Sequence, residues 1–275
     1  MMKKAYQLEN RGPFRADQLH PGDPYELSNG HPIQCLPTGS RGGRATNVGG
    51  GVLASDPAVE HVGVDVGFSP SPEILRAPDL SVGEMPDQPG WVQGVPSLAV
   101  EYADTGQDEA ELRIKIQELF AAGTRYVWVV RLIGPRRVEV HQPKMRMRIA
   151  NPGEQLVAPG VLANPVPVEA LYDREVANRV IFRNLLERQG YENLDQVRAE
   201  GETEGRAAGE MEGRAAGEME GLRKAIVAIF AGRGLVLDGD LQSALSNSNS
   251  LAVLESALRQ AVTGSPDEIL RALRA

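Results

Sequence analysis

Residues 98–133 read LAVEYADTGQDEAELRIKIQELFAAGTRYVWVVRLI, and the fold class is predicted from this segment. It begins with a short apolar run and ends, at 125–133, with a run of β-branched and aromatic residues, so both ends are predicted to be strands. Gly123 is well placed to end a helix before the second strand. The intervening residues 107–122 have helical spacing, with an apolar stripe made by Leu112, Ile116, Leu119 and Phe120.

Further strands are predicted on both sides of this stretch. Residues 62–68 alternate in polarity, and residues 74–82 form another run with Pro78 at its start. Residues 137–141 follow a Gly-Pro turn and are expected to pair beside the strand at 125–133. The order of strands and helix predicts an α/β (α+β) domain with a mixed sheet and a crossover helix.

The N-terminal part of the chain favours a hairpin. Two short strand-like runs, 25–27 and 32–36, flank Ser28-Asn29-Gly30, and an Asn-Gly pair favours a tight turn. After Thr38 the sequence could open a helix. The three glycines at 49–51 disfavour that helix, because glycine is a poor helix former.

From about residue 173 the pattern becomes helical. The octet EGRAAGEM occupies 204–211 and is repeated without change at 212–219, and glycine recurs every fourth residue from Gly201 to Gly221. Such a helix would fray alone, and close approach of a second helix could offset the cost. The predicted domains are a core at 1–175, a helical Gly-repeat linker at 176–221 and a small helical region at 222–275.

Composition limits the classes of function. The formal net charge is −8, so the chain lacks the basic excess of a protein held to nucleic acid by charge alone. No apolar run is long enough to span a bilayer. Cys35, the single cysteine, excludes an internal disulfide and is expected to be a small core residue. These features predict a cytoplasmic protein without membrane partners.

Two carboxylates lie at the ends of predicted strand segments. Asp79 begins a predicted strand, and Glu101 ends the apolar run 98–100, where an unpaired glutamate would be costly to bury. On neighbouring strands of one sheet such carboxylates can share a divalent ion. Lys115, on the following helix, would add an amine that stabilises developing negative charge. Taken alone, Lys115 is better interpreted as a solvated helix residue.

At these residues the chain resembles the Uma-type (Uma-two) family of putative restriction endonucleases, within the PD-(D/E)xK nuclease superfamily. In the common form of that signature the lysine stands two residues after the glutamate, where this chain has Ala103, and Lys115 is the proposed substitute. The matching segments follow one another over roughly the first 170 residues: 25–30, 78–82, 96–101, Lys115, Gly123, 126–130 and 166–171.

The resemblance implies a restriction-endonuclease-like core that hydrolyses phosphodiester bonds of DNA with Mg²⁺ or Mn²⁺. It implies Lys115, Glu101 and Asp79 as the catalytic residues, with Asp79 and Glu101 as metal ligands. Glu26 is a candidate additional acid and Asp65 a further one. No organic cofactor is implied.

A second reading is an inactive nuclease-like scaffold that acts in binding or oligomeric assembly. The family usually has a hydroxyl-rich turn after the glutamate, whereas this chain has Ala103-Asp104-Thr105-Gly106. This departure and the acidic balance favour the scaffold. In either reading the helical tail is expected to form a homo-oligomer.

Overall fold

The structure is a computed structural model, and it describes residues 12–106 and 108–274. The chain divides into two compact units, Met1–Asn193 and Leu194–Ala275. The first extends beyond residue 175, the predicted end of the core, because the helix after that point packs on the first unit.

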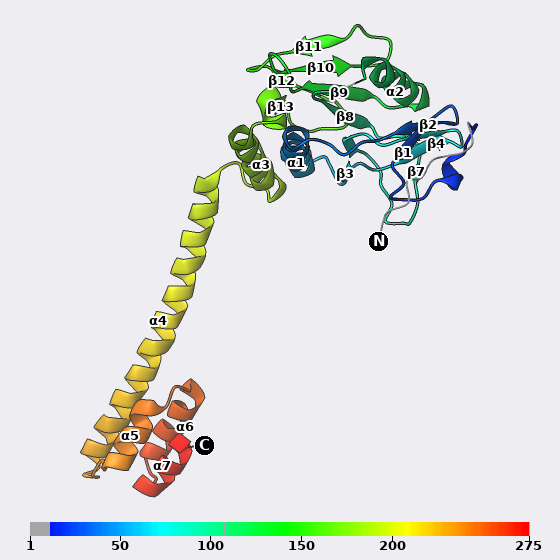
Figure 1. Cartoon of the computed structure of the whole chain (residues 1–275). Coiled ribbons are helices and arrows are strands. Elements are labelled where there is room, and N and C mark those ends of the chain that lie inside the picture. Colours follow the sequence, from blue (N-terminus) through cyan, green and yellow to red (C-terminus); the bar gives the residue numbers. More distant parts are fainter. Residues whose placement is uncertain (1–11, 107, 275) are drawn as a thin grey trace. The chain divides into compact units, whose positions relative to one another are not determined.

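A large mixed sheet forms the centre of the first unit (Figure 1). Strands β8 and β9 are parallel, and all other neighbouring pairs in this sheet are antiparallel. Helix α2 (Glu109–Ala122) connects β8 to β9, so the predicted crossover unit is confirmed. The strand order is β11 (Arg148–Ala150), β10 (Arg137–His141), β9 (Tyr126–Arg131), β8 (Leu98–Ala103), β6 (Leu80–Val82) and β3 (Val62–Val64).

A second sheet contains the predicted hairpin. Its turn residues Asn29 and Gly30 both have positive φ, 48° and 75°, which suits a two-residue turn between antiparallel strands. The strand order is β2 (His31–Gln34), β1 (Tyr25–Ser28), β5 (Ile74–Arg76), β4 (Phe68–Ser71) and β7 (Val92–Gln93). The smaller elements of this unit are η1 (Ala16–Gln18), β12 (Gln155–Leu156), β13 (Val166–Pro167) and η2 (Val168–Leu171).

Helices cover both faces of the large sheet. On one face, Leu112, Ile116 and Leu119 of α2 pack on alternate residues of β8 and β9. On the other face, α1 (Ser40–Ser55) and α3 (Arg174–Arg188) pack over a larger apolar core that includes the fully buried Trp128. Figure 1 shows α2 beside β8 and β9. The α/β class and the mixed sheet predicted from the sequence are confirmed.

Two of the predicted strands are each divided in the structure. The segment 62–68 forms β3 and then breaks at Asp65, whose φ of 52° is left-handed and cannot continue a strand. The segment 74–82 forms β5 and β6, which belong to different sheets. Pro78 lies between them, and a proline lacks the N–H that a continuous ladder requires. Both breaks bring acidic residues to the same edge of the large sheet.

The glycines at 49–51 lie inside α1, contrary to the expectation that they disfavour a helix. A Cβ on Gly49 would lie 2.0 Å from the Tyr102 hydroxyl oxygen, which itself donates a hydrogen bond of 2.9 Å to the Leu171 carbonyl. A Cβ on Gly50 would lie 3.2 Å from Leu80 Cδ2. The glycines therefore let α1 approach β6 and β8 closely, and tertiary packing outweighs their low helix propensity.

The second unit is helical. The repeat lies within α4 (Leu194–Gly232), and a Cβ added to any glycine from Gly201 to Gly221 would meet nothing within 4 Å among the described residues. The C-terminal part of α4 contributes the buried Ile226 and Phe230 to a small apolar core. That core is completed by α5 (Gly239–Asn247), α6 (Leu251–Ala261) and α7 (Pro266–Arg274).

Two remaining expectations concern Cys35 and membranes. Cys35 is exposed, so its assignment to the core is wrong. It follows β2, the edge strand of its sheet, which has a neighbouring strand on one side only. Across the described ranges, every helix is too short or too polar to cross a bilayer.

Candidate active site

A cavity of about 410 Å³ lies where the two sheets diverge, and candidate residues from four segments line it. Glu26 comes from β1, Asp65 from the break after β3, Asp79 from the start of β6, and Lys115 from α2. Glu101 is buried and does not line the cavity, but it forms an ion pair with Lys115, which does. The cavity therefore collects every acid singled out in the sequence, either in its wall or directly behind it.

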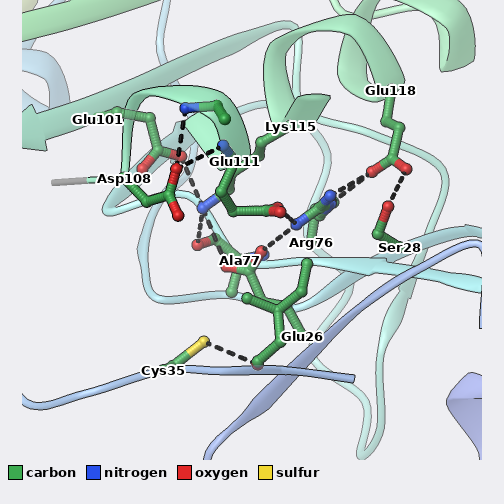
Figure 2. A network of polar contacts seen from close by, with 12 residues as sticks. Glu26, Ser28, Cys35, Arg76, Ala77, Glu101, Asp108, Glu111, Lys115 and Glu118 are labelled. Atoms are coloured by element: carbon green, nitrogen blue, oxygen red, sulfur yellow. Dashed lines mark hydrogen bonds and ion pairs between the residues drawn. The ribbon is translucent and has the colours of Figure 1, made fainter. Parts of the chain in front are cut away.

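Lys115 is the central contact of this group (Figure 2). Its ammonium donates hydrogen bonds to Glu26 Oε1 at 2.9 Å and to the Ala77 carbonyl at 2.8 Å. Its Nζ also lies 2.8 Å from Glu101 Oε1. Burial alone would lower the pKa of Lys115, but the charges of Glu101 and Glu26 outweigh burial and raise the pKa above its ordinary value. The lysine is therefore a permanently charged member of the site.

Helical spacing explains why a lysine faces inward here. The buried positions of α2 are Leu112, Lys115, Ile116 and Leu119, which follow one another at intervals of three, one and three residues. Lys115 thus belongs to the stripe that packs on β8. Glu101 lies on the same face of β8 as Ala99 and Ala103, small residues that leave space for the long side chain of the lysine.

The register of β6 and β8 brings Asp79 to Glu101. Leu80 pairs with Val100 in this antiparallel ladder, so the next step along it sets Asp79 opposite Glu101 on the same face. Asp79 Oδ2 accepts a hydrogen bond of 2.6 Å from the Tyr102 N–H. This bond fixes the carboxylate at the sheet edge, and its other oxygen makes no hydrogen bond to a described residue.

The acids carry more negative charge than the lysine balances. Burial, with the charge of Asp79 as a further cause, raises the pKa of Glu101 to about 8, although Lys115 opposes the change. Burial also raises the pKa of Asp79, and the nearby Asp65 adds to this effect. By contrast, Lys115 and Arg76 together overcome burial and lower the pKa of Glu26. Glu26 is thus the carboxylate that is stabilised in its ionised form beside Lys115. The negative charges of Glu101 and Asp79 are only partly balanced by nearby cations.

A divalent cation fits this electrostatic situation. Glu101 Oε1 is a buried carboxylate oxygen 2.8 Å from Lys115 Nζ, and burial outweighs the charge of this lysine in its effect on the pKa of Glu101. No set of three His, Cys, Asp or Glu side chains among those residues forms a ready cage for a metal. Mg²⁺ seldom needs one, since it keeps several waters and binds through one or two carboxylates together with substrate phosphate oxygens. Asp79 and Glu101 suit this mode.

Arg76 is a buried residue of the site that the sequence reading did not find. It is 1% exposed and contacts three carboxylates, Glu118 at 2.6 Å, Glu111 at 2.7 Å and Glu26 at 3.1 Å. Ser28 Oγ donates a hydrogen bond of 2.6 Å to Glu118, which links the hairpin to α2 (Figure 2). An arginine within an apolar strand, together with charges at 111, 115 and 118 on one helix face, was the signal for this network.

Comparisons with known proteins agree with this picture. The family model Uma2, described as "Putative restriction endonuclease", matches residues 11–166, more than half of the chain. A search of curated proteins gave no match. The chain is also similar to the crystal structure of a putative nuclease of the DUF820 group from Anabaena variabilis ATCC 29413, with 16% identity and a TM-score of 0.51 over 60% of this chain and 99% of that one. At this identity the structural likeness shows the fold alone. The family match shows that the chain belongs to the Uma2 family of putative restriction endonucleases.

Proposed function

We propose that the chain is a metal-dependent endonuclease that hydrolyses phosphodiester bonds of DNA. The observation that carries this proposal is the meeting of Asp79, Glu101 and Lys115 at one sheet edge, although they come from three separate segments. Membership of a restriction endonuclease family gives independent support. The cavity of about 410 Å³ beside these residues gives a phosphate group access to them.

Asp79 and Glu101 are the proposed ligands of Mg²⁺ or Mn²⁺. Hard carboxylate oxygens suit both ions. When bound, such an ion polarises a phosphoryl oxygen and makes a water more nucleophilic. The hydrogen bond from the Tyr102 N–H holds Asp79 at the sheet edge, and the flanking strand β6 fixes its distance from Glu101. Asp65, which also lines the cavity, is the proposed additional acid on the open side of the site.

Lys115 is the proposed stabiliser of developing negative charge. Two of its ammonium protons are held by Glu26 and the Ala77 carbonyl. Its ammonium also lies 2.8 Å from Glu101 Oε1. A phosphoryl oxygen in the cavity would compete with Glu101 for this third contact once a cation binds the carboxylate. Glu26 then acts by fixing the lysine and keeping it charged.

Removal of divalent ions tests the function directly. We expect the purified chain to nick a supercoiled plasmid with Mg²⁺ or Mn²⁺ and to leave it intact with a chelator, because two carboxylates alone cannot activate water for this reaction. Gel electrophoresis of the plasmid measures this. A folded protein that cuts neither DNA nor RNA with any divalent ion would refute the proposal.

The second candidate function is assembly of a nuclease-like scaffold through the tail. It is favoured by the glycine face of α4, which is open along Gly201–Gly221 and gives a second helix room for close backbone approach.

Deletion of the second unit tests this alternative. If α4 pairs between chains, the full-length protein is an oligomer and a chain ending at Asn193 is a monomer in light scattering. Gly213→Leu in the full chain should weaken assembly because its side chain blocks close packing, whereas Arg214→Leu, one position along, should not. A monomeric full-length protein contradicts assembly through the tail.

A further inference from the structure

A second, larger cleft lies on the first unit and differs from the acidic site in its charge. It encloses about 1120 Å³ between the N-terminal part of α1, the segment after β9 and the start of α3. Four arginines line it: Arg41, Arg44, Arg136 and Arg174. Only Asp173 and Glu175 oppose them among its lining residues, although the whole chain has a net charge of −8. The cleft is therefore a local basic surface on an acidic protein.

The basic cleft is continuous with the candidate active site. A smaller cavity of about 190 Å³ shares Gly43 and Asn47 with the basic cleft and is also lined by Asp65 and Asp79. Thr38 lines all three cavities. A ligand lying along this path would touch the arginines at one end and reach the proposed metal ligands at the other.

The four arginines differ in whether another side chain already contacts their guanidinium groups. Arg41 is paired with Asp104, to which its Nε donates a hydrogen bond of 2.9 Å. The guanidinium carbon of Arg136 lies 4.8 Å from the centre of the Tyr172 ring, and both residues line the cleft. Arg44 and Arg174 are exposed, and within the described residues neither has a carboxylate partner.

One of the two opposing acids, Asp173, is engaged by the backbone. The carboxylate of Asp173 accepts hydrogen bonds from the N–H groups of Glu175 and Val176 and so serves as the N-cap of α3. The negative charge of Asp173 therefore lies against the N-terminus of α3. Arg44 of α1 and Arg174 at the start of α3 both line the cleft and have donors that can bind an anion.

We propose that this cleft binds the phosphodiester backbone of the DNA whose scissile phosphate lies at Asp79 and Glu101. The planar fork of arginine matches two phosphate oxygens at once, so Arg44 and Arg174 can hold successive phosphates. A repeating polyanion fits better than a single small anion, because the arginines are spread along a path that continues to the acidic site. The proposal rests on the proposed nuclease function, and it identifies the surface that supplies affinity in a chain without general basic charge.

Binding without cleavage tests this assignment. The full chain is titrated in a chelator into a fluorescently labelled 20-base-pair DNA duplex, and anisotropy is followed at several salt concentrations. The double variant Arg44→Ala/Arg174→Ala should bind at least about tenfold more weakly at low salt. Its dependence of log K on log salt should be flatter by about 1.8, since each phosphate contact contributes about 0.9.

A matched control distinguishes the effect of losing the cleft arginines from the effect of losing any two positive charges. Arg146→Ala/Arg179→Ala removes two exposed arginines outside the cleft and should leave both affinity and salt slope unchanged. Equal weakening by the two pairs, no weakening by the cleft pair, or equally tight binding of polyaspartate would overturn the assignment. If the cleft pair alone weakens binding but no metal supports cleavage, the proposed nuclease function fails while the cleft stands. If the cleft variant cuts DNA with unchanged KM, the proposed nuclease function stands and the assignment of the cleft fails.

Discussion

Asp79→Asn is expected to lower the rate of DNA cleavage by at least about 10²-fold, the scale for losing one electrostatic element of a catalytic site. The substitution removes the negative charge proposed to bind the divalent ion. It keeps an oxygen that can accept the hydrogen bond from Tyr102 N–H, so the sheet edge should stay intact. Initial rates of plasmid nicking at saturating Mg²⁺ or Mn²⁺ measure the effect.

Asp87→Asn is the matched control for this experiment. Asp87 is exposed, lies outside the cavity, and undergoes the same chemical change. It should retain the wild-type rate, and both variants should have the melting temperature of the wild type within a few degrees. Full activity of Asp79→Asn in a folded protein would exclude Asp79 as a ligand.

Arg76→Met is expected to cost about 3–5 kcal/mol of the free energy of unfolding, the typical effect of removing one partner from a buried ion pair. Arg76 is 1% exposed and faces Glu26, Glu111 and Glu118. Its loss leaves these carboxylates close together without their shared cation. Urea unfolding near neutral pH measures the change.

The destabilisation by Arg76→Met should shrink as the pH falls. In the wild type the pKa of Glu26 is below its ordinary value, so its ion pairs add stability above the unfolded pKa and lose it as the pH falls through the folded value. The variant keeps the contact of Glu26 with Lys115 but lacks the share of this contribution that comes from Arg76, so the two proteins become more alike in acid. Arg113→Met, an exposed change on the same α2, should cost less than about 0.5 kcal/mol. Equal small costs at both positions would mean that the buried network does not form.

The sequence predicts best where local pattern and packing agree. Residues 98–131 form strand, helix and strand as expected, because the apolar stripe of α2 matches a buried face and Asp108 and Gly123 cap the helix. At 62–82 the pattern was misleading. The alternation continues through Asp65, but its left-handed φ ends β3. The apolar run continues past Pro78, which lacks an N–H and lies between β5 and β6.

The remaining differences depend on contacts between distant residues. Only the fold shows that Gly49 admits the hydroxyl of Tyr102, and hence that three glycines are compatible with α1. The inward direction of Lys115 follows from its place between Leu112 and Ile116 on the helix face. The position of Arg76 under three acids depends on the pairing of β5 with β1, which the sequence does not specify.

The proposed hydrolytic centre is formed by side chains from separate segments. The most direct measurement is crystallographic localisation of Mn²⁺ by its anomalous scattering in crystals of the full chain with uncleaved DNA. We expect a peak within coordination distance of both Asp79 and Glu101, with Lys115 Nζ directed at the adjacent phosphate. A protein–DNA complex whose manganese lies elsewhere, with these two carboxylates unligated, would contradict the assignment.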